Sequence, residues 1–300
     1  MPRMIPKRAR ATSDPARTPM PSPQPDEITV RRVETLAEYH ECVAIQKETW
    51  GTGFRELVVP TILLVAQKLG GVCAGGFAPN GRMLGFVFGM TGVRDGKLVH
   101  WSDLLAVRPE ARGKHLGERL KLYQRDLVLA IGVETMQWTF DPLVARNAHL
   151  NLTRLGARAV EYVPDMYGSD TGSPMHGRLP TDRVVVAWDL TRPPGAEPRS
   201  ARPGLLVNPV AANGLPTLNG LLDAPVVRIA VPRDLESEPN DRRAIWRQVT
   251  REAFASYLGR SYEVVGFRRG QGDELPSYEL SPRGQERSVD ADAGLARAAH

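Results

Sequence analysis

Residues 104–120 have the sequence LLAVRPEARGKHLGERL, and the other parts of the chain are organised around this stretch. Its apolar start predicts the end of a buried strand, and Pro109 predicts the point where strand pairing stops. A helix is expected next, because apolar residues recur at helical spacing: Leu116, Leu120, Tyr123, Leu127 and Ile131. Gly132 stands where a C-terminal cap is expected, and the helix is predicted to begin near Gly113.

The start of this helix is a candidate anion site. A helix N-terminus offers unpaired backbone N–H groups and the positive end of the helix dipole, and Arg112 and Lys114 add charge beside it. Gly113 and Gly117 lack a Cβ, so a phosphate can approach the backbone. A plain strand-to-helix turn with solvated basic residues explains the same pattern. Neither the dinucleotide fingerprint G-x-G-x-x-G nor the phosphate loop G-x-x-x-x-G-K-[ST] occurs in this stretch.

Composition limits the class of protein. The 300 residues are 42% hydrophobic, which is enough for a proper core in one large or two modest domains. The net charge of +5 and the pI of about 9.4 suggest nucleic-acid binding until the charge is located. Residues 1–26 hold five basic and two acidic residues, and the remaining chain is nearly balanced and carries no nucleic-acid-binding motif. We therefore expect no nucleic-acid partner.

The cysteines, the histidines and the longest apolar run predict a protein without a disulfide framework, a metal site or a membrane span. Cys42 and Cys73 are the only cysteines and predict two buried thiols rather than a disulfide framework. The six histidines are scattered and no C-x-x-C occurs, so no metal site is expected. The longest apolar run, 57–66, contains Pro60 and is too short to span a bilayer, and residues 1–26 lack the apolar centre of a signal peptide. The expected location is the cytoplasm, without membrane contact.

Residues 1–26 predict a disordered, basic, Pro-rich tail, and the first ordered unit is expected over 27–190. Thr35 and Glu38 form a capping-box pattern, and Asn80-Gly81 predicts a hairpin turn. The predicted order is strand 28–33, helix 35–50, helix 60–69, strands 72–78, 83–93 and 98–107, the helix from Gly113, strand 133–140, helix 145–155, and strands 158–163 and 184–190.

A second, smaller unit is expected beyond a linker or irregular loop over 191–222, which is rich in Pro, Gly and Asn. Residues 223–280 predict a small α/β unit, and 281–300 a disordered tail. The unit is expected to contain strand 226–231, a helix that Asn240 caps and Gly259 ends, and strand 262–267. It is too small for a secure core of its own, so it should pack on the first unit. Four arginines of the helix predict a solvated face, with an anionic partner as the alternative: Arg242, Arg243, Arg247 and Arg251.

The segment 112–117, Arg-Gly-Lys-His-Leu-Gly, resembles the acyl-CoA-binding segment Arg-x-x-Gly-x-Gly of the GNAT-type N-acyltransferases. It follows a strand that ends in Leu-Ala-Val and a Pro-containing turn, as in that family, and it has His115 at the central glycine. The element order over 27–190 is also that of the GNAT fold. The resemblance implies an α/β (α+β) chain with a mixed, mostly antiparallel sheet flanked by helices, to which the C-terminal α/β unit is added.

The resemblance also implies a site for acetyl-CoA or another acyl-CoA, without a metal. The pyrophosphate would meet the turn, whose residues are Arg112, Gly113, Lys114, His115, Leu116 and Gly117. The pantetheine arm would lie between strands 98–107 and 133–140 where they diverge, against the backbone of Leu105, Ala106 and Val107. Asn147 is expected either to cap its helix or to contact the pantetheine.

Asp103 is the candidate general base, because an acid or histidine on this strand often has that role in GNAT-type enzymes. An Asp that only hydrogen-bonds a turn is the alternative. His100 is a weaker candidate and is predicted to lie at the surface. Leu152 occupies the position where the family often has a Tyr as general acid, so the thiolate would be protonated through Asn151, Tyr162, Tyr167 or a water, or would leave unassisted.

The function implied is transfer of an acetyl or other short acyl group from acyl-CoA to a primary amine of a small molecule. A non-catalytic acyl-CoA-binding or regulatory protein on the same fold is the alternative, motivated by His115 and Leu152. The acyl group and the amine are not specified by the sequence, and formation of a homodimer stays open.

Overall fold

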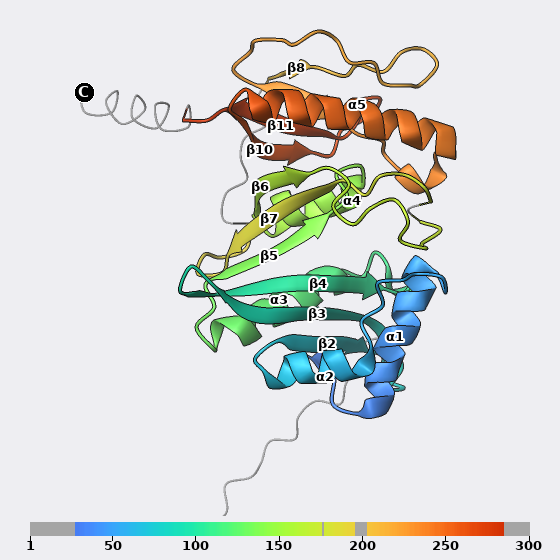
Figure 1. The fold of residues 1–300 in the computed structure, drawn as a ribbon, viewed down its shortest axis with the longest axis vertical. Coiled ribbons are helices and arrows are strands. Elements are labelled where there is room, and N and C mark those ends of the chain that lie inside the picture. Colours follow the sequence, from blue (N-terminus) through green and yellow to red (C-terminus); the bar gives the residue numbers. More distant parts are fainter. Residues whose placement is uncertain (1–27, 176, 196–202, 285–300) are drawn as a thin grey trace, which may run out of the picture.

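The computed structural model describes residues 28–175, 177–195 and 203–284, and within them the chain forms two β-sheets (Figure 1). The predicted tail 1–26 lies outside the described residues, as does 285–300 of the predicted tail 281–300.

The first sheet has seven strands in the order β1-β2-β3-β4-β5-β7-β6. Only β4 and β5 run parallel, and every other neighbouring pair is antiparallel, which confirms the mixed, mostly antiparallel sheet. The strands are β1 Thr29–Arg32, β2 Val72–Phe77, β3 Met83–Arg94, β4 Lys97–Val107, β5 Thr135–Phe140, β6 Arg158–Val163 and β7 Arg183–Asp189.

Helices cover both faces of this sheet. They are α1 Leu36–Trp50, α2 Pro60–Lys68, α3 Leu116–Leu129 and the short α4 Ala145–Ala148, which continues as a π-helical turn over His149–Arg154. The buried side chains of α1 and α2 pack with Phe86 and Phe88 of β3, whereas those of α3 pack with Val87 on the other face. As predicted, α1 begins with a capping box in which Thr35 and Glu38 bond each other's backbone N–H groups.

The helix α3 begins at Leu116, three residues later than predicted. Pro109–Ala111 form a 3₁₀ turn, and Gly113 and His115 both have positive φ, which a right-handed helix cannot contain. The buried face also differs from the predicted apolar stripe, since Ile131 is exposed. The buried residues of the helix are Leu116, Leu120, Lys121, Gln124 and Val128.

The second sheet has four strands in the order β10-β11-β9-β8, and the long helix α5 packs against it (Figure 1). Its elements are β8 Leu205–Leu206, β9 Val227–Ala230, the 3₁₀ turn Leu235–Ser237, α5 Asn240–Gly259, β10 Tyr262–Arg268 and β11 Ser277–Pro282. The strand β8 lies inside the predicted linker, and β11, which was not predicted, runs two residues into the predicted tail. The expected cap at Asn240 is wrong: Pro239 holds the cap position and no side chain bonds the helix start.

One hydrophobic core runs through both sheets, as expected for a C-terminal unit too small to fold around its own core. The Phe254 ring of α5 stacks on Tyr162 of β6 with ring centroids 4.9 Å apart, and it meets Tyr278 of β11 edge-on at 5.1 Å. The Tyr278 hydroxyl donates to the carbonyl of Pro142, 2.8 Å away, just after β5.

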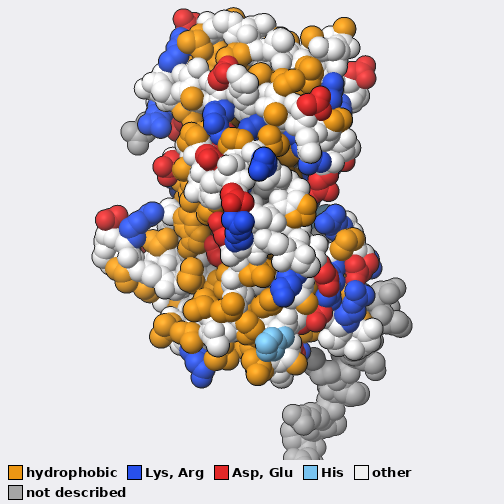
Figure 2. Space-filling model, turned by 45° about the vertical axis from the view of Figure 1, so that its right-hand side comes forward, with side chains coloured by type: hydrophobic (Ala, Val, Ile, Leu, Met, Phe, Trp, Pro, Cys, Tyr) orange, Lys and Arg blue, Asp and Glu red, His pale blue; other side chains and the backbone are white. Residues whose placement is uncertain are grey.

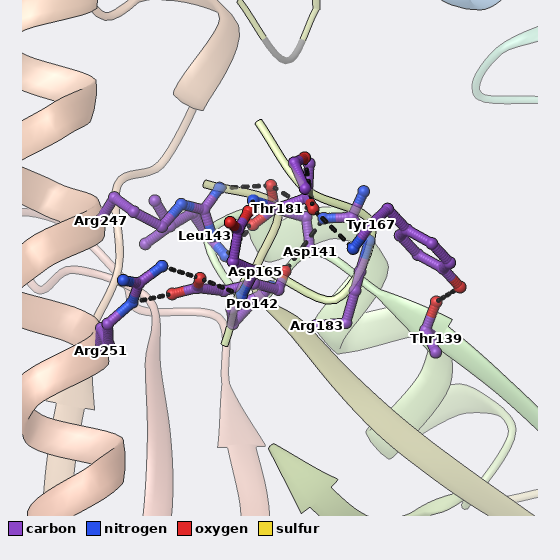
Figure 3. A network of polar contacts seen from close by, with 12 residues as sticks. Thr139, Asp141, Pro142, Leu143, Asp165, Tyr167, Thr181, Arg183, Arg247 and Arg251 are labelled. Atoms are coloured by element: carbon purple, nitrogen blue, oxygen red, sulfur yellow. Dashed lines mark hydrogen bonds and ion pairs between the residues drawn. The ribbon is translucent and has the colours of Figure 1, made fainter. Parts of the chain in front are cut away.

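Ion pairs fasten α5 to the first unit, so the predicted solvated face is wrong for Arg247 and Arg251 (Figure 3). The Arg247 guanidinium donates to both carboxylate oxygens of Asp141, at 2.9 and 2.5 Å, and Arg251 pairs with Asp182. Burial alone would raise the pKa of Asp141, but the charges of Arg247 and Arg183 hold it below its ordinary value. The sequence spacing of the arginines gave no sign of this, because their partners are 69 to 106 residues away.

Replacement of Arg247 by methionine should lower the free energy of unfolding at pH 7 by about 3 kcal/mol, because it leaves a buried carboxylate without its bidentate partner. Denaturant unfolding measures this. Arg55→Met, at the exposed pair with Asp170, is the control and should cost less than about 1 kcal/mol. Because the folded-state pKa of Asp141 is depressed, its contribution is present above the unfolded pKa and is lost as pH falls through the folded pKa. An unfolding free energy equal to wild type at pH 7 would contradict the structural role.

Candidate active site

The strands β4 and β5 form a cleft where they separate. They pair from Val99 with Thr135 to Trp101 with Gln137, and no pairing follows, although both strands continue. The edge of β4 from Ser102 onward therefore faces the cleft unpaired, while its other edge stays bonded to β3. This is the divergence that the sequence led us to expect, and we call it the β4–β5 cleft.

A cavity of about 570 Å³ occupies the β4–β5 cleft and extends to the C-terminal unit. Its wall therefore combines both units, and Arg247 helps to line it while holding Asp141. The polar lining residues from the first unit include Glu56, Ser102, Asp103, Lys121, Thr139, Asn147, Asn151, Tyr167 and Arg183, and those from the C-terminal unit are Glu236, Arg243 and Arg247.

Asp103 is placed in the cavity wall by a β-bulge. Leu104 pairs with Phe88 and Ser102 pairs with Gly89, so Asp103 is the extra residue of β4. Such a bulge turns a side chain out of the normal alternation, and here the Asp103 side chain is exposed to the cavity. Surrounding protein raises the pKa of Asp103, and a hydrogen bond with the Trp101 side chain opposes that rise.

Glu56 and Tyr167 lie near Asp103 in the same cavity. Burial raises the pKa of Glu56, Arg183 opposes the rise, and the charge of Asp103 adds to it. The Tyr167 hydroxyl lies 3.1 Å from Oγ1 of Thr139 (Figure 3), and burial raises its pKa so that it stays protonated. Sequence reasoning named Tyr167 as one alternative and missed Glu56, which stands in a loop with no motif around it.

Two of the weaker candidates are engaged elsewhere. His100 is fully buried rather than at the surface; its Nδ1 lies 2.9 Å from Thr91 Oγ1, its Nε2 lies 2.9 Å from Gln124 Nε2, and it does not line the cavity. Burial lowers the pKa of His100 to about 3, and the charge of Lys121 adds to this. The Tyr162 hydroxyl donates to Asp182 at 2.6 Å, outside the cavity lining.

The turn 112–115 is exposed, and no side chain caps the start of α3. The first backbone N–H groups of α3 therefore stay available to an anion. Gly113 has φ of +78°, and a Cβ built there would meet nothing within 4 Å. Gly117 is the second residue of α3, where a Cβ would reach Leu105 at 3.7 Å.

His115 takes the left-handed conformation, with φ of +55°. Glycine adopts this conformation without cost, and among other residues His is one of the more tolerant. The His115 side chain is 70% exposed, and its Nδ1 lies 3.5 Å from the Glu118 carboxylate, which also pairs with Arg154 at 2.9 Å. The turn thus keeps its shape with a side chain at the central position.

The remaining predicted residues border the cleft. Ala106 is buried with the α1 face of the sheet, while Leu105 and Val107 are half-buried and pack with the core on the α3 face. Asn147 is the third residue of α4 and lines the cavity. It does not cap the helix, because Val144 holds the cap position without a side-chain bond. Asn151 is buried and also lines the cavity.

The strand order, the β4–β5 cleft and the exposed turn before α3 together define a GNAT-type fold over the first sheet and its helices. No protein-family model and no curated protein sequence matches the chain.

Solved structures similar to this chain include three acetyltransferases. The ribosomal-protein-S18-alanine N-acetyltransferase of Escherichia coli is 16% identical, with a TM-score of 0.43, over 59% of this chain and 100% of that one. A GNAT-family acetyltransferase of Streptococcus pneumoniae is 17% identical, with a TM-score of 0.43, over 54% and 98%. A candidate acetyltransferase of Salmonella typhimurium, solved with its cofactor acetyl-CoA, is 18% identical, with a TM-score of 0.44, over 59% and 98%.

Within the described ranges, no helix is long and apolar enough to cross a membrane, and no group of three or more His, Cys, Asp or Glu is placed to hold a metal ion. On the face shown in Figure 2, basic and acidic side chains are interspersed.

Proposed function

We propose that this chain is an acyl-CoA-dependent N-acyltransferase that moves an acetyl or other short acyl group to a primary amine of a small molecule. Residues 27–190 would form the acyl-CoA-binding domain, and the unit 223–280 would complete the acceptor pocket. The observation that carries this proposal is the β4–β5 cleft, whose unpaired β4 edge leads along the chain into the exposed turn before α3 and which opens into a cavity lined by Asp103 and Glu56.

The donor would bind along the cleft. Its pyrophosphate would meet the open N-terminus of α3, with charge from Arg112 and Lys114. The pantetheine arm would then hydrogen-bond the unpaired edge of β4 near Leu105 and Val107, as a neighbouring strand does. A backbone N–H of this edge would stabilise the oxyanion that forms when an amine attacks the thioester.

The acceptor would meet the carboxylates. Among the described residues, neither Asp103 nor Glu56 is within ion-pair distance of a Lys or Arg, so both can attract an ammonium group. Asp103 would take the amine proton as the nitrogen attacks the carbonyl carbon, and its raised pKa favours this role. The C–S bond then breaks, and Tyr167 or a water held by Asn151 would protonate the thiolate.

The non-catalytic alternative rests on Leu152, which cannot donate a proton. Tyr167 weakens that argument, because its protonated hydroxyl lines the same cavity from a different segment. We propose the cytoplasm as the compartment, since the buried thiols of Cys42 and Cys73 are both free, with their Sγ atoms 4.0 Å apart.

Two measurements test the proposal. Calorimetry with CoA and acetyl-CoA should show binding of both, and release of free thiol should then be followed with acetyl-CoA and a panel of primary amines. Binding together with amine-dependent thiol release supports the enzyme. Binding without release for every amine and acyl group favours the non-catalytic alternative, and absence of CoA binding contradicts both.

A further inference from the structure

Lys121 lies at the apex of the β4–β5 cleft. It belongs to α3, one turn after Gly117 on the same face of the helix. Its Nζ is 2.7 Å from Ser102 Oγ and 3.9 Å from the centre of the Trp138 ring, and these two residues directly follow the last pair between the strands. The side chain is 2% exposed and lines the cavity. Lys121 therefore touches both strands at the point where they part.

The Lys121 amine has no charged partner. Among the described residues no carboxylate pairs with it, and its bond to Ser102 starts a directed chain of hydrogen bonds. The Thr91 hydroxyl donates to a backbone carbonyl, so it accepts the hydrogen bond from Nδ1 of His100, and every donor along the chain points away from Lys121. The chain contains no carboxylate, so it gives the amine no negatively charged partner. The chain passes in order through Ser102, Gln124, His100, Thr91 and the carbonyl of Gly70.

A charged amine without an anionic partner is energetically unfavourable in this position. Burial lowers the pKa of Lys121 well below its ordinary value, because nothing nearby compensates the charged form. An ammonium group has three donors, of which one meets Ser102 and another faces the Trp138 ring, so one is left for a ligand in the cavity. An anionic oxygen there would restore the charged form and pair with it.

We infer that Lys121 selects an acyl-CoA whose acyl group ends in a carboxylate, that is, the CoA thioester of a dicarboxylic acid. This rests on the proposed function, in which the thioester lies in the β4–β5 cleft. An acyl chain that points to the apex would then place its far end against the Lys121 amine. An acetyl group carries no such oxygen and would leave the amine unpaired.

Calorimetry with CoA, acetyl-CoA, malonyl-CoA and succinyl-CoA tests the inference. Wild type should bind malonyl-CoA or succinyl-CoA at least about tenfold more tightly than acetyl-CoA. Lys121→Met should weaken the preferred thioester about 30-fold or more, the range for loss of one partner of a buried charge pair. Its affinities for CoA and acetyl-CoA should stay near wild type, since neither ligand pairs with the amine.

Further variants separate charge recognition from a structural role. Lys121→Arg keeps the charge and should retain part of the preference, and the melting temperature of Lys121→Met should not fall, because an unpaired buried amine is replaced by an apolar chain of similar length. If wild type binds CoA but does not prefer a dicarboxylic thioester, the inference is overturned and the proposed function stands. Acyl-modified Lys121, detected by mass spectrometry, would also overturn it, and absence of CoA binding overturns both.

Discussion

Asp103→Asn is expected to lower kcat/KM for amine acylation at pH 7 by about a hundred- to ten-thousand-fold, the range for loss of a general base. An amine with a pKa near 10 is free base in roughly one molecule in a thousand at pH 7, so a positioned base matters. Asparagine keeps the size and shape of Asp103 and removes its basicity. Steady-state kinetics measures the rate, and calorimetry should give an acyl-CoA affinity near wild type.

The pH dependence of kcat/KM identifies the group that acts as the general base. Asp103 acts deprotonated and its pKa is raised, so wild-type kcat/KM should rise as pH rises through that pKa. The variant should lack this limb, and its deficit should shrink towards the amine pKa as more substrate arrives deprotonated. Glu56→Gln is the matched control, since it removes the neighbouring carboxylate and should cost less. If Glu56→Gln carries the large loss and Asp103→Asn does not, the base is Glu56.

Gly113→Glu is expected to weaken CoA binding at least about 100-fold, because it places a negative side chain where the pyrophosphate would lie and like charges in contact cost several kcal/mol. The fold should survive, since the turn is exposed and a Cβ at Gly113 meets no atom within 4 Å. Calorimetry with CoA gives the affinity, and thermal unfolding checks the fold.

Gly81→Glu is the matched control for this change. Gly81 lies in the turn between β2 and β3, has φ of +82°, and also leaves a Cβ with no neighbour within 4 Å. The two variants therefore bear the same backbone strain and the same added charge. Gly81→Glu should keep wild-type CoA affinity. If the two variants bind CoA equally, the donor site does not lie at the turn 112–117.

Locally encoded elements were predictable. The Thr35–Glu38 capping box, Pro60 at the first turn of α2 and Asn80-Gly81 between β2 and β3 each act within a few residues, so the sequence alone locates the elements they begin or join. The segments that were missed, β8 and β11, depend on remote partners. β8 has only two residues, and β11 follows a polar loop, so neither has a strong pattern of its own.

Polar residues of the core were the hardest to place. Lys121 and Gln124 lie on the buried face of α3, but their polarity hides that face from any apolar periodicity. His100 was predicted at the surface for the same reason, although a hydrogen bond at each ring nitrogen allows it to be buried. Their burial depends on partners that come together only when β3, β4 and α3 pack.

By itself, the sequence determined the order of elements over residues 28–190 and the glycine turn before α3, because hydrophobic period, caps and turn residues act over short distances. The mixed sheet was expected from the resemblance to the GNAT-type N-acyltransferases. The tertiary structure decided which side chains share the cavity. The bulge at Asp103 arises from the register between β3 and β4, and Glu56, Lys121, Tyr167 and Arg247 reach the cavity from four separate segments. Such proximity results from packing between distant segments, which no local pattern encodes.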